Sequence, residues 1–228
     1  MVHTTGRYGE HLVIEGIQGR YGWPVLGRTF DYLTDTHAFG YKMRARYGEV
    51  YQLCIPQSLE FAKYWFHRLG HEHPKWWPLH SVHHSVKRMH LLNGFRIHPL
   101  YHLCTFLLGV VPCYLIGASE EALIINSVIL AIGGSIQHCN IKLRYGWLNY
   151  IFNTNELHRW HHSKNISEGN TNYGAVLIVY DVLFGTHYYR PDAEPLELGI
   201  SDEERYPMNN YWKQLLIPFR WKSQILDK

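Results

Sequence analysis

Histidine is the residue type whose number and spacing in this sequence most clearly indicate chemistry. The chain of 228 residues contains 17 histidines, and thirteen of them lie between His67 and His162. A neutral imidazole ring is a good ligand for iron, zinc, copper and nickel. This clustering in the middle of the chain predicts a metal site and excludes a terminal purification tag.

Three groups of these histidines have helical spacing. His67 and His71 are four residues apart, so on a helix they share one face and can hold one ion. A first triad follows Pro78, which suits the first turn of a helix, and a second follows the potential caps Asn153 and Thr154. The three rings of each triad are expected to point one way. The triads are His80, His83 and His84, and His158, His161 and His162.

The number of rings predicts more than one ion. The pair and the two triads make eight candidate ligands, whereas one metal ion takes about four to six. Eight histidines buried without a metal are disfavoured, because each ring would need its own hydrogen-bond partners. The spacing alone does not select the metal. Oxidation of an unactivated carbon–hydrogen bond would need a redox metal such as iron, and zinc can occupy the same nitrogen sites in recombinant protein.

Two charge-free runs separate the first two histidine groups from the last. They are residues 99–119 and 122–141, with Glu120 and Glu121 between them. About 20 residues of helix cross a hydrocarbon core of about 30 Å, so the runs predict a transmembrane hairpin. A buried hairpin in a soluble core is the alternative, because Pro112, Gly133 and Gly134 interrupt the runs.

The charges that flank the hairpin predict its orientation. Positive residues favour the cytoplasmic side of a membrane, and they lie outside both runs, on the same side as the histidine groups. The sequence therefore predicts an integral membrane protein whose histidine cluster faces the cytoplasm. The flanking positive residues are Lys87, Arg88, Arg96, Lys142 and Arg144.

Composition excludes several classes of protein. Hydrophobic residues make up 46% of the chain, aromatic residues 15% and charged residues 18%, which excludes a disordered or fibrous protein. The net charge of +3 is too balanced for nucleic acid as the main partner. The four cysteines lack the spacing of a disulfide framework or a zinc ribbon. The organisation predicted for the chain is an amino-terminal extension (residues 1–57), a histidine-box domain (58–200) and a carboxyl-terminal tail (201–228).

The histidine groups and their neighbours resemble the fatty acid hydroxylase and sterol desaturase superfamily of membrane di-iron oxygenases. The resemblance covers about residues 59–200. Its motifs are Tyr64 to Arg68, the His67/His71 pair, His80 to Ser85, Arg96 to Pro99, Gln137 to Asn140, His158 to Ser163, Asn172 to Gly174, Asp181, and Phe184 to Thr186.

The resemblance implies an all-α, integral-membrane helical bundle with a transmembrane hairpin and a cytosolic histidine-rich helical cap. Two iron ions would activate dioxygen to hydroxylate or desaturate a lipid of the sterol or fatty acyl type. Some members carry a further histidine four positions after His138, where this chain has Lys142. A structural or supporting role is expected for His98 and His102. The implied ligands are His67, His71, His80, His83, His84, His138, His158, His161 and His162.

Further residues are expected to support the metal ligands or to bind a partner. A ligating histidine usually donates its other N–H group to a carboxylate or a carbonyl. Candidates for this role are Glu60, Glu72, Asn155, Glu156, Asn172 and Asp181. The sequence has no nucleotide-binding turn, cysteine cluster or haem motif, so a separate electron-donor protein of the ferredoxin or cytochrome type is expected. Candidates for its docking face are Lys75, Lys87, Arg88, Arg159 and Lys164.

The first 53 residues are atypical of the superfamily, because they contain none of the apolar helices that usually precede the first histidine pair. Residues of about 20–53 resemble the opening segment of haem-thiolate cytochrome monooxygenases, through a turn at residues 22–27 and the sequence Arg46 to Val50. Two alternatives to a lipid oxygenase therefore stay open. One is a truncated, non-catalytic metal-binding membrane protein, and the other is a soluble metallohydrolase.

Overall fold

The computed structural model describes residues 60–115, 118–201, 203, 204 and 206–220, together with the isolated positions 42, 45 and 46. Within this part of the chain, helices are the regular secondary structure, and extended pairing is limited to two isolated bridges. The prediction of an all-α protein is therefore confirmed for the described residues. The predicted amino-terminal extension and its cytochrome-like motifs lie outside them, apart from the three isolated positions.

Three helical segments carry the predicted histidine groups. Residues 60–72 form one helix, α3 spans Trp77–His84, and α6 spans Asn155–His161. Pro78 lies in the first turn of α3, where its missing N–H group costs no hydrogen bond. Thr154 is the N-cap of α6, and its side chain accepts a hydrogen bond from the backbone of Leu157. Both helix starts agree with the sequence analysis.

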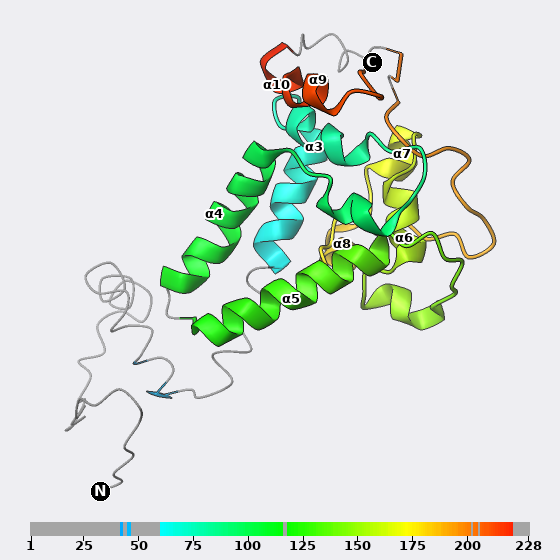
Figure 1. Ribbon diagram of the computed structural model, residues 1–228. Helices are drawn as coiled ribbons and strands as arrows, with labels where there is room; N and C mark the ends of the chain where they lie inside the picture. The colour runs from blue at the N-terminus through cyan, green and yellow to red at the C-terminus, as the bar shows by residue number, and fades with distance from the viewer. Residues whose placement is uncertain are drawn as a thin grey trace, which may run out of the picture.

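The two apolar runs form a helical hairpin, but both helices are shorter than the runs. Helix α4 spans Pro99–Leu115 (17 residues), and α5 spans Glu120–Gln137 (18 residues). Ser119 caps α5, and Glu120 and Glu121 in its first turn complement the helix dipole. Figure 1 shows α4 and α5 as two long helices joined at one end. No helix in the described residues is both long enough and apolar enough to span a bilayer.

The hairpin exposes much of its apolar surface. The described part of the chain leaves large side chains of both helices uncovered, at positions three and four residues apart. Such a continuous apolar stripe is what a helix presents to a neighbouring hydrophobic phase. The exposed residues include Leu103, Phe106 and Leu107 on α4, and Ile125, Val128, Ile129 and Ile132 on α5.

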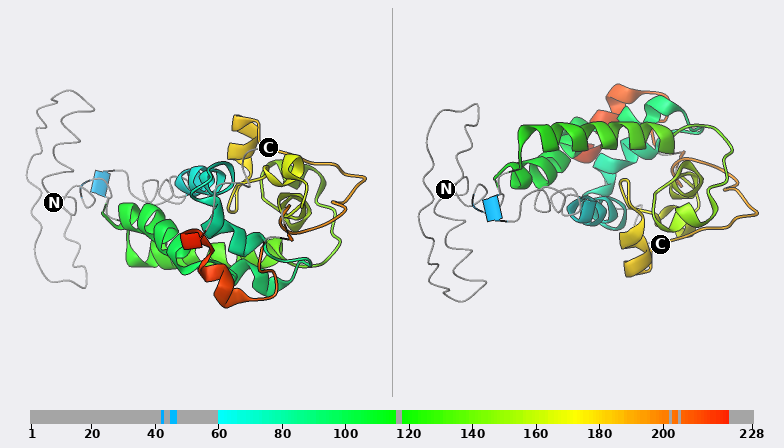
Figure 2. Two further views of the ribbon diagram at one scale, coloured as in Figure 1. Left: turned by 90° about the horizontal axis from the view of Figure 1, so that it is seen from above. Right: turned by 90° about the horizontal axis from the view of Figure 1, so that it is seen from below.

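The remaining elements surround the histidine helices. Helices α7 (Ile166–Gly169) and α8 (Val179–Phe184) follow α6, and the views in Figures 1 and 2 place α6 and α7 away from the α4–α5 connection. The short 3₁₀ helix η1 (Leu91–Phe95) packs against α5, and a second, η2 (Gly146–Tyr150), precedes α6.

The described part of the carboxyl-terminal tail packs on α3. Helices α9 (Tyr211–Leu215) and α10 (Ile217–Arg220) both contact α3. A buried cluster of Ile200, Tyr206 and Ile217 forms the core of this contact, and Trp77 at the start of α3 packs against it. The tail therefore covers one side of the helix that carries the first histidine triad.

Candidate metal centre

All nine histidines predicted as ligands come together in two adjacent groups. In each group, one ring nitrogen of every member lies within 4.8 Å of those of the others. Eight of the nine rings are buried, and His67 is partly buried. The five-ring group consists of His67, His71, His80, His84 and His161, and the four-ring group consists of His83, His138, His158 and His162.

Each triad is divided between the two groups, which corrects the expectation that its three rings point one way. His80 and His84 belong to the five-ring group, whereas His83 belongs to the four-ring group. On the second triad the assignment is the opposite: His158 and His162 belong to the four-ring group, whereas His161 belongs to the five-ring group. Successive residues of a helix are rotated by about 100°, so residues four apart point alike and the residue between them points elsewhere. Both helices therefore contribute to both groups.

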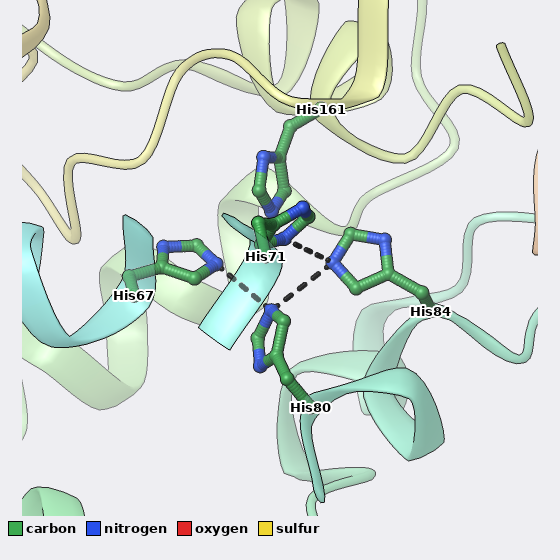
Figure 3. Close-up of side chains that lie close together, drawn as sticks. All are labelled: His67, His71, His80, His84 and His161. Atoms are coloured by element: carbon green, nitrogen blue, oxygen red, sulfur yellow. Dashed lines mark hydrogen bonds between the residues drawn. The ribbon is translucent and has the colours of Figure 1, made fainter. Parts of the chain in front are cut away.

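The distances within each group are those expected around one ion. In the five-ring group, Nε2 of His80 lies 3.0 Å from Nε2 of His67 and 3.1 Å from Nε2 of His84 (Figure 3). In the four-ring group, Nε2 of His138 lies 3.1 Å from Nε2 of both His83 and His158. Two nitrogens about 2.1 Å from the same ion, at right angles to each other, are about 3.0 Å apart.

The hydrogen bonds of the outer nitrogens determine the protonation of several rings. Nδ1 of His83 lies 3.3 Å from the carbonyl oxygen of Arg96, and Nδ1 of His138 lies 2.6 Å from that of Gly134. A carbonyl oxygen only accepts hydrogen bonds, so each Nδ1 carries the proton. In a neutral ring, Nε2 then has a lone pair and no hydrogen. The Nε2 lone pairs of His83 and His138 therefore face each other.

Two facing lone pairs need a cation between them. A shared proton is disfavoured, because burial lowers the pKa of His138 to about 4 and that of His83 well below its usual value. His161 leads to the same conclusion in the five-ring group. Its Nδ1 donates to the carbonyl oxygen of Thr171, and its buried Nε2 has no hydrogen-bond partner. Both groups therefore have the donor chemistry that a metal ion requires.

A single loop supplies the outer hydrogen bonds of three rings in the five-ring group. The carbonyl oxygen of Tyr173 accepts from His67 at 2.7 Å, and that of Thr171 accepts from His161 at 2.7 Å. The side-chain oxygen of Asn170 lies 3.1 Å from Nδ1 of His71. These contacts orient rings from two helices that are far apart in the sequence.

Two of the carboxylates and amides predicted to support the rings bind the backbone near the rings and not the rings themselves. None of these six side chains forms a hydrogen bond with a ligand ring in the described structure. Asp181 is fully buried and accepts hydrogen bonds at 2.7 Å from the backbone N–H groups of Tyr173 and Gly174. Asn172, with a left-handed φ of 55°, binds the backbone of Leu157 and Tyr188. Both side chains hold the loop that orients the rings.

The other predicted residues divide between structural and surface positions. His98 is buried and its Nε2 donates to the carbonyl oxygen of Leu215, whereas His102 is exposed. Two cations of the predicted docking face already have partners within the chain: Lys87 pairs with Glu203, and Lys164 pairs with Glu197 and Glu203. Free positive charge on that face is therefore smaller than the sequence indicates.

A small cavity reaches the five-ring group. Its volume is about 80 Å³, and its lining includes His71, His84 and His161. Trp77 lies at the same cavity, with its ring 5.3 Å from that of His71 and 5.6 Å from that of His84. Lys164 and Asn170 also line the cavity. The sequence does not place Trp77 at the histidine groups, because tryptophan has no ligand nitrogen and only the fold brings it to the rings.

The family of the chain follows from comparison with known proteins. The sequence model of the fatty acid hydroxylase family matches residues 54–186, and this segment contains all nine histidines. The chain belongs to the fatty acid hydroxylase family. The match confirms the resemblance that the histidine motifs indicated. No solved structure matches this family member.

Two kinds of curated relative illustrate the similarity. The ornithine lipid hydroxylase of Rhizobium tropici is 40% identical over 171 residues, which are 74% of this chain and 51% of that protein. The alkylglycerol monooxygenase of Homo sapiens is 29% identical over 161 residues, which are 68% of this chain and 33% of that protein. This member of the fatty acid hydroxylase family therefore spans about half, or less, of the length of these relatives.

Proposed function

We propose that this protein is a membrane-bound di-iron oxygenase that hydroxylates or desaturates a lipid, of the sterol or fatty acyl type, with dioxygen and external electrons. The observation that carries the proposal is the arrangement of nine histidine rings in two adjacent groups, in which backbone carbonyls fix the inward direction of the lone pair on four rings. Membership of the fatty acid hydroxylase family supports the same chemistry. The proposed metal ligands are the nine histidines of the five-ring and four-ring groups.

The contribution of the protein to this reaction is to hold neutral donors in fixed directions. Iron, when bound, would supply the redox chemistry that activates dioxygen. Burial keeps the rings unprotonated near neutral pH and available as ligands. The carbonyl oxygens of Thr171, Tyr173 and Gly134 fix the ring orientations, so little reorganisation accompanies metal binding.

The hairpin supports a location at the membrane. Its uncovered apolar side chains would be buried if α4 and α5 entered the bilayer, and each large side chain removed from water contributes about 1.5–3 kcal/mol. We propose that the hairpin inserts with its connection away from the cytoplasm. The histidine groups would then lie at the cytoplasmic surface, within reach of a membrane lipid.

The names of the relatives indicate which substrates to test first. An ornithine lipid and an alkylglycerol are the molecules named for the two relatives, and both belong with sterols and fatty acyl lipids in a first panel. An electron-donor protein of the ferredoxin or cytochrome type completes the proposed reaction, because no cofactor motif in the sequence supplies electrons.

The proposal is tested by metal content and product formation in the same preparation. The full chain, purified with its membrane lipids and loaded with iron, is expected to bind two ions per chain. It should form a hydroxylated or desaturated product when dioxygen and an electron donor are present. His83→Ala and His161→Ala are expected to abolish the product, whereas His102→Ala, at an exposed position, should leave it unchanged.

Other results would contradict the proposal in different ways. A chain without bound metal would rule out the metal centre. Two bound ions without dioxygen consumption, with every donor and lipid tested, would favour the non-catalytic metal-binding protein. Release from membranes without detergent, together with hydrolytic activity, would favour the soluble metallohydrolase.

A further inference from the structure

The carboxyl-terminal tail lies outside the segment that matches the family, yet it reaches the residues that orient the four-ring group. The family match ends at residue 186, whereas α9 spans Tyr211–Leu215. Gln214 of α9 is fully buried, at 0% exposure, and polar side chains are rarely buried so completely unless they have hydrogen-bond partners. Its partners therefore indicate what the tail does.

Both ends of the Gln214 amide are bound. Its Oε1 accepts hydrogen bonds from Nη2 of Arg96 at 2.7 Å and from Oγ of Ser85 at 3.1 Å. Its Nε2 donates to the carbonyl oxygens of Pro207 and Met208. The amide thus ties the tail to the segment between α3 and α4.

Arg96 connects Gln214 with a metal ligand. The guanidinium of Arg96 also donates from Nε to the carbonyl oxygen of Val82, and it lies 5.5 Å from the ring of Tyr211. The backbone carbonyl of Arg96 is the acceptor for Nδ1 of His83. A guanidinium held at several fixed points restricts the backbone of its own residue, and Gln214 provides one of these points. Gln214 thereby helps to hold the Arg96 carbonyl where His83 binds it.

Three rings of the five-ring group have a separate set of supports. The outer nitrogens of His67, His71 and His161 all bind the loop at residues 170–173. That loop is held by Asp181 and Asn172, whose hydrogen bonds in the described structure go to residues before the tail. The hydrogen bonds of Gln214 therefore reach the support of His83 and do not reach the loop that orients these three rings.

We propose that Gln214 is a positioning residue for the four-ring group, so that this one side chain of the carboxyl-terminal tail controls one metal position and not the other. This inference rests on the proposed function, because it requires that both groups bind metal. Gln214 acts through Arg96 on His83, and it does not touch the ion itself.

The test is Co²⁺ binding by the full-length, metal-free protein in detergent micelles. Ions are counted per chain, and the visible absorption of Co²⁺ bound to histidine is followed during the titration. We expect the wild-type protein to bind two ions. Gln214→Met removes all four hydrogen bonds at nearly constant volume, and it should weaken one site by about 10–100-fold, as is typical when a group that orients a ligand is lost. Lys213→Met, at the exposed neighbouring position of α9, should bind two ions normally.

Double variants assign the weakened site. Gln214→Met combined with His138→Ala should still bind the single ion that His138→Ala binds alone, because both changes affect the four-ring group. Gln214→Met combined with His67→Ala should weaken both sites. Gln214→Glu keeps an oxygen acceptor for Arg96 and Ser85 but sets its second carboxylate oxygen against the carbonyl oxygens of Pro207 and Met208, so it is expected to restore only part of the lost affinity. A general loss of structure would instead weaken both sites in parallel.

The outcomes separate this inference from the proposed function. If the wild-type protein binds no Co²⁺, the proposed metal centre is wrong. If the wild-type protein and Gln214→Met both bind two ions with equal affinity, or if Gln214→Met also weakens the ion retained by His138→Ala, only the role of the tail is wrong. If Gln214→Met does not fold, Arg96→Lys decides, because it breaks the contact from the other side; two normal sites in that variant would overturn the inference.

Discussion

At the scale of single residues, the direction of each ring proton is what distinguishes a metal centre from a cluster of buried histidines. In four of the nine rings the acceptor on Nδ1 is a backbone carbonyl, so the proton stays on the outer nitrogen and the lone pair points inward. Burial opposes protonation of the inner nitrogens. A cation between the inward lone pairs would therefore stabilise each group, and its removal should lower the free energy of unfolding.

The metal-free protein is expected to lose stability as the pH falls from about 6.5 to about 4. Burial lowers the pKa of His138 from 6.5 to about 4, so in this interval the unfolded chain binds protons that the folded chain does not. The free energy of unfolding then decreases with falling pH, by about 2 kcal/mol between neutral pH and pH of about 5 for this residue alone. Chemical unfolding in micelles at several pH values measures this decrease in the free energy of unfolding. The exposed His102→Gln variant should keep the full dependence, and a flat profile for the parent protein would contradict the prediction.

Asp181→Asn should loosen the loop that orients the five-ring group. Asp181 now accepts from Tyr173 with one carboxylate oxygen and from Gly174 with the other, so the substitution keeps one acceptor and places an amide N–H group opposite the other backbone N–H group. Loss of that buried hydrogen bond costs about 1–3 kcal/mol, and metal affinity at the five-ring group should fall about 10–100-fold. Thermal unfolding and Co²⁺ titration measure the two effects. Asp192→Asn makes the same chemical change at an exposed position and should alter neither.

At the scale of elements, the close approach of η1 to α5 sets the position of His138. A Cβ atom on Gly94 would lie 3.1 Å from the carbonyl oxygen of Gly134 and 3.3 Å from Nδ1 of His138. That carbonyl oxygen is also the acceptor for His138. The absence of a side chain at Gly94 therefore allows the 3₁₀ helix to pack directly beside a proposed metal ligand.

Gly94→Ala and Gly134→Ala form a matched pair that tests this contact. Gly94→Ala should destabilise the protein by about 1–3 kcal/mol and weaken metal binding at the four-ring group, because the new methyl group is overpacked. A Cβ on Gly134 meets nothing within 4 Å, so Gly134→Ala should stabilise α5 by up to about 1 kcal/mol. Thermal unfolding of both variants gives the comparison. Equal effects of the two substitutions would show that the contact is unimportant.

At the scale of the whole molecule, the hairpin and the helices that follow the second histidine triad lie apart. Figures 1 and 2 place α6 and α7 away from the α4–α5 connection. Large apolar side chains along α4 and α5 are exposed. A hairpin that entered a bilayer by its connection would therefore leave α6 and α7 outside it.

Charged substitutions on α5 should weaken membrane binding. Ile125 and Ile129 are four residues apart and are 59% and 50% exposed, so they share the uncovered face. Replacing both with aspartate should lower the partition onto phosphatidylcholine vesicles at least about 10-fold, because two apolar contacts are lost and two charges would enter the bilayer. Ile166→Asp, at a position 61% exposed on α7, should have no effect. Vesicle flotation measures the bound fraction, and unchanged binding by the double variant would argue against insertion of the hairpin.

The sequence by itself determined which residues form the centre and which elements carry them. Spacings of three and four identified the helical triads, Pro78 and Thr154 indicated where α3 and α6 begin, and Glu120 and Glu121 marked the connection of the hairpin. These features are local, because helix geometry and capping depend on residues within one or two turns. His138 required the resemblance to a family, since it stands alone in the sequence.

Only the tertiary structure decided how the rings are shared and what holds them. The division of each triad depends on where the neighbouring helices lie, and spacing along one helix cannot show this. Four of the outer nitrogens donate to backbone carbonyls, those of Thr171, Tyr173, Arg96 and Gly134. Every residue has a carbonyl group, so its identity carries no signal in the sequence. Its direction is set only when loops and the carboxyl-terminal tail pack against the helices.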